Sequence, residues 1–68
     1  MRLSARNQLV GKVVKVQKGA VNGIVTLEYN GGSISGTISM AAIKELELAS
    51  GKEAVAVIKA TSVMFGVE

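Results

Sequence analysis

Alternating apolar and polar positions, the period of a β-strand, run through most of this 68-residue chain. These segments are rich in β-branched residues and are separated by turns that contain Gly and Asn. The strongest turn signal is Asn30-Gly31-Gly32, because Asn and Gly tolerate a positive φ. The pattern predicts five strands, at residues 8–17, 22–29, 33–39, 53–59 and 63–67.

One segment follows the helical period instead. Met40, Ile43 and Leu46 recur at helical spacing, and Ser39 before them is a suitable N-cap. We therefore predict a short helix over residues 40–46, between the third and fourth strands. Three strands, a short helix and two strands is the element order of a five-stranded OB-like barrel, so the predicted fold class is all-β. The length predicts a single domain over residues 1–68.

Some of the predicted strands are apolar on both faces. Residues 54–58 read Ala-Val-Ala-Val-Ile, and residues 13–14 are both Val, although a small barrel needs only one apolar face per strand. A chain this short buries little surface by itself, and it has no Cys or His for disulfides or a zinc site. We therefore expect a homo-oligomer. Within the chain, Met64 and Phe65 are predicted to be core, and Gly11, Gly23 and Gly36 to mark bulges or bends.

The charge and the residue types exclude several function classes. Eight Lys and Arg against five Glu give a net charge of +3, which disfavours a cation-binding role, and no metal site is expected. Ser-His and Cys-His couples are impossible. Spacing does not exclude a Glu pair, but solvated surface charge explains the Glu residues better, and we expect no enzyme. One Tyr and one Phe leave little for nucleic-acid bases to stack on, so a nucleic-acid partner is not expected.

The location follows from what the chain lacks. It has no secretory h-region and no apolar run long enough to span a bilayer. These features predict a cytoplasmic protein without a membrane partner.

Three stretches without carboxylates concentrate hydrogen-bond donors at strand ends. Small residues there expose backbone N–H groups, next to hydroxyl, amide or cationic side chains. Such a set suits a tetrahedral oxyanion, whose oxygens only accept hydrogen bonds. A fully deprotonated anion such as molybdate or sulfate fits better than phosphate, which often carries a proton. Taken singly, each stretch is better explained as a polar arm, a turn or a strand break than as a binding site. The stretches are Ser4 to Gln8, Lys18 to Asn22 and Lys59 to Ser62.

Together, the three stretches resemble the molbindins, the small Mop proteins whose module also forms the accessory domain of molybdate transporters and regulators. The resemblance covers essentially the whole chain. It is carried by Ser-Ala-Arg-Asn-Gln at 4–8 before Gly-Lys-Val-Val at 11–14, by Lys-Gly-Ala-Val-Asn at 18–22, and by Lys-Ala-Thr-Ser-Val-Met at 59–64. The resemblance implies a Mop/TOBE-type OB-like domain that forms a homohexamer, a trimer of dimers. It also implies binding of molybdate or tungstate at subunit interfaces, without a cofactor, for intracellular molybdenum storage or homeostasis.

The resemblance also implies two kinds of oxyanion site. In the first, Arg6 and Lys59 would supply positive charge, and Ser4 and Thr61 would supply hydroxyl groups. In the second, backbone N–H groups of the turn at residues 18–22 and the Asn22 side-chain amide would bind the oxyanion. Ala60 stands where the family often has Ser, and Ser62 where it often has an acidic residue. The candidate oxyanion-binding residues are Ser4, Ala5, Arg6, Asn7, Lys18, Gly19, Ala20, Val21, Asn22, Lys59, Ala60, Thr61 and Ser62. The alternative is an oligomeric interaction or nucleic-acid-binding module without a specific oxyanion.

Overall fold

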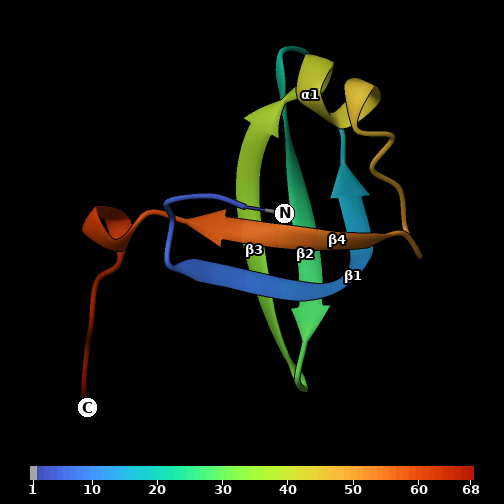
Figure 1. Ribbon diagram of the computed structural model, residues 1–68. Helices are drawn as coiled ribbons and strands as arrows, with labels where there is room; N and C mark the ends of the chain where they lie inside the picture. The colour runs from blue at the N-terminus through green and yellow to red at the C-terminus, as the bar shows by residue number, and fades with distance from the viewer. Residues whose placement is uncertain (1) are drawn as a thin grey trace.

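Four strands form one strongly curled antiparallel sheet in the computed structural model, which describes residues 2–68 (Figure 1). The strands lie in the order β3-β2-β1-β4. The first half of β1 pairs with β4 and the second half pairs with β2, so the sheet folds over along β1 into a half-barrel. The strand bounds are β1 Asn7–Gln17, β2 Asn22–Tyr29, β3 Gly32–Ser39 and β4 Glu53–Ile58.

Gly11 lies in β1 beside the residue at which the strand changes partner. A Cβ atom there would overlap the carbonyl oxygen of Glu28, so glycine allows β1 and β2 to approach each other. A register shift between Val13 and Lys15 follows, and it marks a β-bulge. The expectation of a bend is met at Gly11. At Gly36, β3 keeps an unbroken register with β2, so no β-bulge lies there.

Local signals place the hairpin and the helix as expected. Asn30 and Gly31, with φ of 44° and 79°, form the two-residue turn between β2 and β3. Helix α1 (Met40–Glu45) begins after Ser39, whose Oγ accepts a hydrogen bond from the Ala42 N–H at 3.1 Å. The helix ends one residue earlier than predicted, since Leu46 is its C-cap.

The hydrophobic core lies where α1 covers one end of the curled sheet (Figure 1). Its buried apolar side chains are Val13 of β1, Leu27 of β2 and Ile43 of α1. Gly23 in β2 makes room for the helix, because a Cβ there would lie 2.6 Å from Cδ1 of Ile43. Gly23 is therefore a point of close packing rather than a bulge. No helix within residues 2–68 has the length and apolar character needed to cross a membrane.

The predicted fifth strand at residues 63–67 is wrong. A single 3-10 turn, η1 (Ala60–Ser62), follows β4, and the rest of the chain runs away from the sheet (Figure 1). Met64 and Phe65, predicted to be core, are 91% and 96% exposed. The prediction fails because the tail has the composition of a strand but meets no neighbouring strand in its own chain. The five-stranded barrel is therefore an open, four-stranded one.

Candidate functional site

The first and third donor stretches meet at one end of the molecule. β1 and β4 are antiparallel, with Asn7 opposite Ile58. The residues just before β1 and those just after β4 therefore leave the same end of this ladder. The Asn7 side-chain amide donates a hydrogen bond to the Ile58 carbonyl at 3.3 Å, which ties the two segments together. The structure thus brings together Ser4, Ala5, Arg6 and Asn7 with Lys59, Ala60, Thr61 and Ser62, which we call the ladder-end cluster.

Most polar side chains of the ladder-end cluster are open to solvent. Lys59 takes the N-cap position of η1 without a side-chain hydrogen bond to it, and its carbonyl accepts the Ser62 N–H at 2.9 Å. Within residues 2–68, no hydrogen bond is formed by the side chains of Ser4, Arg6, Lys59, Thr61 or Ser62. These five side chains are exposed, and their donors remain available to a ligand.

Gln8 belongs to the first donor stretch but not to the predicted binding residues, and the structure gives it a positioning role. Its side-chain amide donates to the Ala5 carbonyl at 3.0 Å, and Gln8 itself is partly buried in β1. This bond fixes the N-terminal arm relative to the strand. A polar residue inside an apolar strand was the available signal, but its partner three residues earlier is seen only in the folded chain.

The second stretch forms the turn between β1 and β2, at the opposite end of β1 from the ladder-end cluster (Figure 1). A Cβ at Gly19 would overlap the Asn22 carbonyl, so this turn requires glycine. The Val21 carbonyl accepts the Met40 N–H at 2.8 Å, which joins the turn to the start of α1. Ala20 and Val21 are exposed.

Part of this turn lines a hollow of about 280 Å³. Lys18, Gly19 and Asn22 belong to the predicted set, whereas Thr37 comes from β3 and was missed. Thr37 reaches the hollow because it pairs with Ile24 across the β2–β3 ladder, a contact that the sequence around it does not indicate. The remaining lining residues are Gln17, Gly23 and Ile24.

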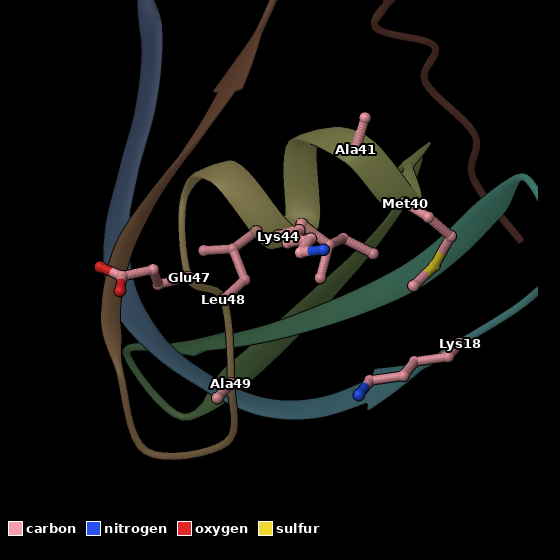
Figure 2. Close-up of a pocket in the computed structure, with 8 residues that line it drawn as sticks. Lys18, Met40, Ala41, Lys44, Glu47, Leu48 and Ala49 are labelled. Carbon is pink, nitrogen blue, oxygen red and sulfur yellow. The ribbon is translucent and has the colours of Figure 1, made fainter.

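A larger hollow of about 610 Å³ lies between this turn and α1 (Figure 2). Its lining is mainly apolar, and its charged residues are Lys18, Lys44 and Glu47. A mainly apolar lining offers few hydrogen-bond donors to an oxyanion, so this hollow fits an oxyanion less well than the donor stretches do. Within residues 2–68, no three His, Cys, Asp or Glu side chains gather in a way that could hold a metal ion. The hollow is lined by Lys18, Met40, Ala41, Ile43, Lys44, Glu47, Leu48 and Ala49.

The half-barrel and its order of elements match a known domain. The model of the TOBE domain family matches residues 3–65. The probable molybdenum-pterin-binding protein of Haemophilus influenzae is 61% identical over 69 residues, covering all of both chains. The solved structure of MopII from Clostridium pasteurianum is 45% identical with a TM-score of 0.92, covering 97% of this chain and all of that one.

A longer protein contains the same unit. The cytoplasmic molybdate-binding protein ModG, solved with molybdate bound, is 48% identical with a TM-score of 0.94. The match covers all of this chain and 49% of the ModG chain. These matches define a TOBE domain. The chain belongs to the TOBE family and, within it, to the small molybdenum-pterin-binding (Mop) proteins, which confirms the resemblance predicted from the three stretches.

Proposed function

We propose that this protein binds molybdate, and also tungstate, at sites completed between subunits of a homo-oligomer. The observation that carries the proposal is the ladder-end cluster, where two donor-rich stretches without carboxylates begin at the same end of the β1–β4 ladder. The similarity to ModG with molybdate bound, and to MopII, supports molybdate as the anion. The proposed role is that of a binding protein for molybdenum storage or homeostasis, not of an enzyme. A cytoplasmic location is proposed because ModG is described as cytoplasmic.

The chemistry of the cluster suits a dianion. Arg6 and Lys59 would supply two positive charges, and the hydroxyl groups of Ser4 and Thr61 would donate directional hydrogen bonds. Ala60 lacks a hydroxyl and would contribute only its backbone N–H. Each donor would satisfy one of the acceptor oxygens, and no carboxylate of the cluster would oppose the charge.

A subunit boundary at the cluster would strengthen the binding. In a single chain these side chains are exposed, and an exposed ion pair contributes little free energy because water screens it. Covering the anion with a second chain would lower the local dielectric constant and make each charge-assisted hydrogen bond stronger. We further propose that the size of the enclosed space favours molybdate over the smaller sulfate.

The turn Lys18 to Asn22 is proposed as the second kind of site. Gly19 and Asn22 line the 280 Å³ hollow, where backbone N–H groups and the Asn22 amide would bind the anion. Its distance from the ladder-end cluster along β1 means that one chain would contribute to two separate sites.

Isothermal titration calorimetry of the intact protein tests the proposal. Molybdate and tungstate are expected to give saturable binding and a rise in melting temperature, with little response to sulfate or phosphate. If molybdate added to the folded oligomer gives neither heat of binding nor a change in melting temperature, the proposal is wrong. Binding of oligonucleotides that weakens steeply with salt would instead favour a nucleic-acid module.

Lys59→Ala tests the ladder-end cluster directly. Loss of one charge-assisted hydrogen bond costs about 1.5–3 kcal/mol, which corresponds to binding of molybdate that is about 10- to 100-fold weaker. Lys12→Ala removes another exposed positive charge, from the middle of β1, and serves as the control. If both variants bind molybdate equally well, Lys59 is not part of the site.

A further inference from the structure

Two Asn-Gly pairs stand in this chain, at residues 22–23 and 30–31, and the structure gives them different surroundings. Asn-Gly is the dipeptide most prone to spontaneous loss of the side-chain amide, because glycine has no Cβ to shield its backbone nitrogen. The third asparagine, Asn7, precedes Gln8 and lacks this feature. The sequence alone gives Asn22 and Asn30 the same reactivity, so a difference between them has to come from the fold.

Asn30 and Gly31 form the exposed tip of the hairpin between β2 and β3 (Figure 1). No atom lies within 4 Å of a Cβ built at Gly31, so the space beside this residue is open. Within residues 2–68, no side-chain hydrogen bond holds the Asn30 amide, and no hydrogen bond of a turn or loop is donated by the Gly31 N–H. The Asn30 Cγ and the Gly31 nitrogen are therefore both free to approach each other.

Asn22 precedes a glycine as well, but the sheet and the helix hold that glycine in place. Gly23 pairs with Ile38 in the β2–β3 ladder and is buried. A Cβ built at Gly23 would lie 2.6 Å from Cδ1 of Ile43 and 3.1 Å from the Gln17 carbonyl oxygen. Rotation of the Asn22 peptide toward its own side chain would pull Gly23 out of the ladder and away from α1. Ring closure at Asn22 therefore requires local unfolding.

We propose that Asn30 is a site of spontaneous deamidation in the folded protein and that the fold protects Asn22 from the same reaction. The Gly31 nitrogen attacks the Asn30 Cγ and forms an N–C bond. The Cγ–Nδ2 bond breaks, and ammonia leaves with the proton of the Gly31 N–H, which gives a succinimide ring. Water then adds to either ring carbonyl and opens the ring to aspartate or isoaspartate. Water is the co-reactant, and nothing is oxidised or reduced.

Isoaspartate changes the hairpin more than aspartate does. In isoaspartate the main chain runs through Cβ, so the turn gains one backbone atom. Asn30 and Gly31 form a two-residue turn with φ of 44° and 79°, and this geometry sets the strand register at the closing pair of Tyr29 and Gly32. A longer turn does not fit that register. We expect the β2–β3 ladder to loosen at this end and the melting temperature to fall.

Protection of Asn22 also bears on the second kind of oxyanion site, a point that rests on the proposed function. The Asn22 amide is a proposed donor there, and deamidation would replace it with a carboxylate, which repels an anion. Exposure, hydrogen bonding and packing at the two dipeptides carry the deamidation proposal without any ligand. Its tests are run without molybdate, so their failure leaves the binding proposal standing, and a failure of molybdate binding leaves deamidation of Asn30 standing.

Peptide mapping of aged protein tests the proposal, because Glu28 stands between the two asparagines. The folded protein is kept in warm, mildly alkaline buffer, and samples are cleaved after glutamate, which places Asn22 and Asn30 on separate peptides. Tandem mass spectrometry should show that Asn30 is deamidated at least about tenfold faster than Asn22, with isoaspartate detected by an isoaspartyl methyltransferase. Equal rates at the two residues of the folded protein, or an Asn30 that stays intact, overturns the proposal.

Unfolded protein and two variants provide the controls. In guanidinium chloride, Asn22 and Asn30 should react at similar rates, and a difference that persists there would mean that the fold does not protect Asn22. Asn30→Gln should abolish the modification, because glutamine would have to close a larger ring. The isoaspartate form, isolated by chromatography, should melt below the Asn30→Asp variant, which has the same charge and a normal backbone. Equal melting temperatures would show that the added backbone atom does not disturb the turn.

Discussion

Gly11 determines how sharply the sheet can curl. It lies in β1 next to the residue shared by the β4 and β2 ladders, and a Cβ there would meet the backbone carbonyl of Glu28 as well as Cδ2 of Leu27 at 3.1 Å. The Leu27 side chain could rotate away. The Glu28 carbonyl could not, because Glu28 is held in register by both of its neighbouring strands. Gly11→Ala would therefore force β1 and β2 apart at the bend.

The size of the effect follows from this geometry. Overpacking a well-packed region costs about 1–3 kcal/mol, and an overlap with backbone that cannot move belongs at the upper end. We expect Gly11→Ala to lower the free energy of unfolding by about 3 kcal/mol. For a domain of this size, that corresponds to a fall in melting temperature of about 12–24 °C.

Gly32→Ala is the matched control. A Cβ at Gly32 would lie 3.7 Å from the Tyr29 carbonyl oxygen, which is an ordinary van der Waals contact. The free energy of unfolding of the Gly32→Ala variant should be unchanged or slightly higher, because alanine reduces the entropy of the unfolded chain. Both variants are compared by urea unfolding followed by circular dichroism, at one fixed chain concentration because self-association adds to stability. If the two free energies of unfolding agree within about 0.5 kcal/mol, β1 and β2 do not approach as closely as described.

Two further predictions concern the ends of α1 and use the same unfolding assay. Ser39→Ala removes the hydrogen bond that the Ser39 Oγ accepts from the Ala42 N–H and should lower the free energy of unfolding by about 1 kcal/mol. The control, Ser33→Ala on an exposed part of β3, should leave the free energy of unfolding almost unchanged. Equal losses of stability in the two variants would argue against the cap. Glu47→Gly should raise the free energy of unfolding by about 1 kcal/mol. Glu47 has a left-handed φ of 54° just after the helix C-cap, and glycine adopts this conformation without a steric penalty. A loss of stability in this variant would mean that the Glu47 side chain makes a contact worth more than the backbone strain.

Much of the fold was predictable because its signals are local. The second strand has the predicted bounds, 22–29, since a turn signal stands at each of its ends. The helix start was visible in Ser39, but its end was not, because the left-handed residue after the C-cap is Glu47 rather than glycine. Leu48 still closes the helix with an N–H bond to the Ile43 carbonyl at 3.0 Å.

The candidate site was predictable only in part. Composition and spacing indicated three donor stretches without carboxylates, and the resemblance to the Mop proteins combined the first with the third. The hydrogen bond between Asn7 and Ile58, 51 positions apart, depends on which strands pair, and the sequence pattern does not encode that partnership. Thr37 was missed for the same reason, because its place beside the hollow depends on the pairing of β3 with β2.

The C-terminal tail shows most clearly where the sequence stops being informative. Its alternation predicts a strand over residues 63–67, and the structure has no strand there. A strand needs an edge, however, and hydrogen bonding to an edge is a property of the assembled sheet. By itself the sequence determined the all-β class, the positions of the turns and the chemistry of the donor stretches, because these follow from neighbouring residues. Only the tertiary structure decided that β1 pairs with both β2 and β4, and that the first and third donor stretches share one end of the sheet. It also decided that the tail leaves its own half-barrel open. Each of these features depends on contacts between segments far apart in the chain.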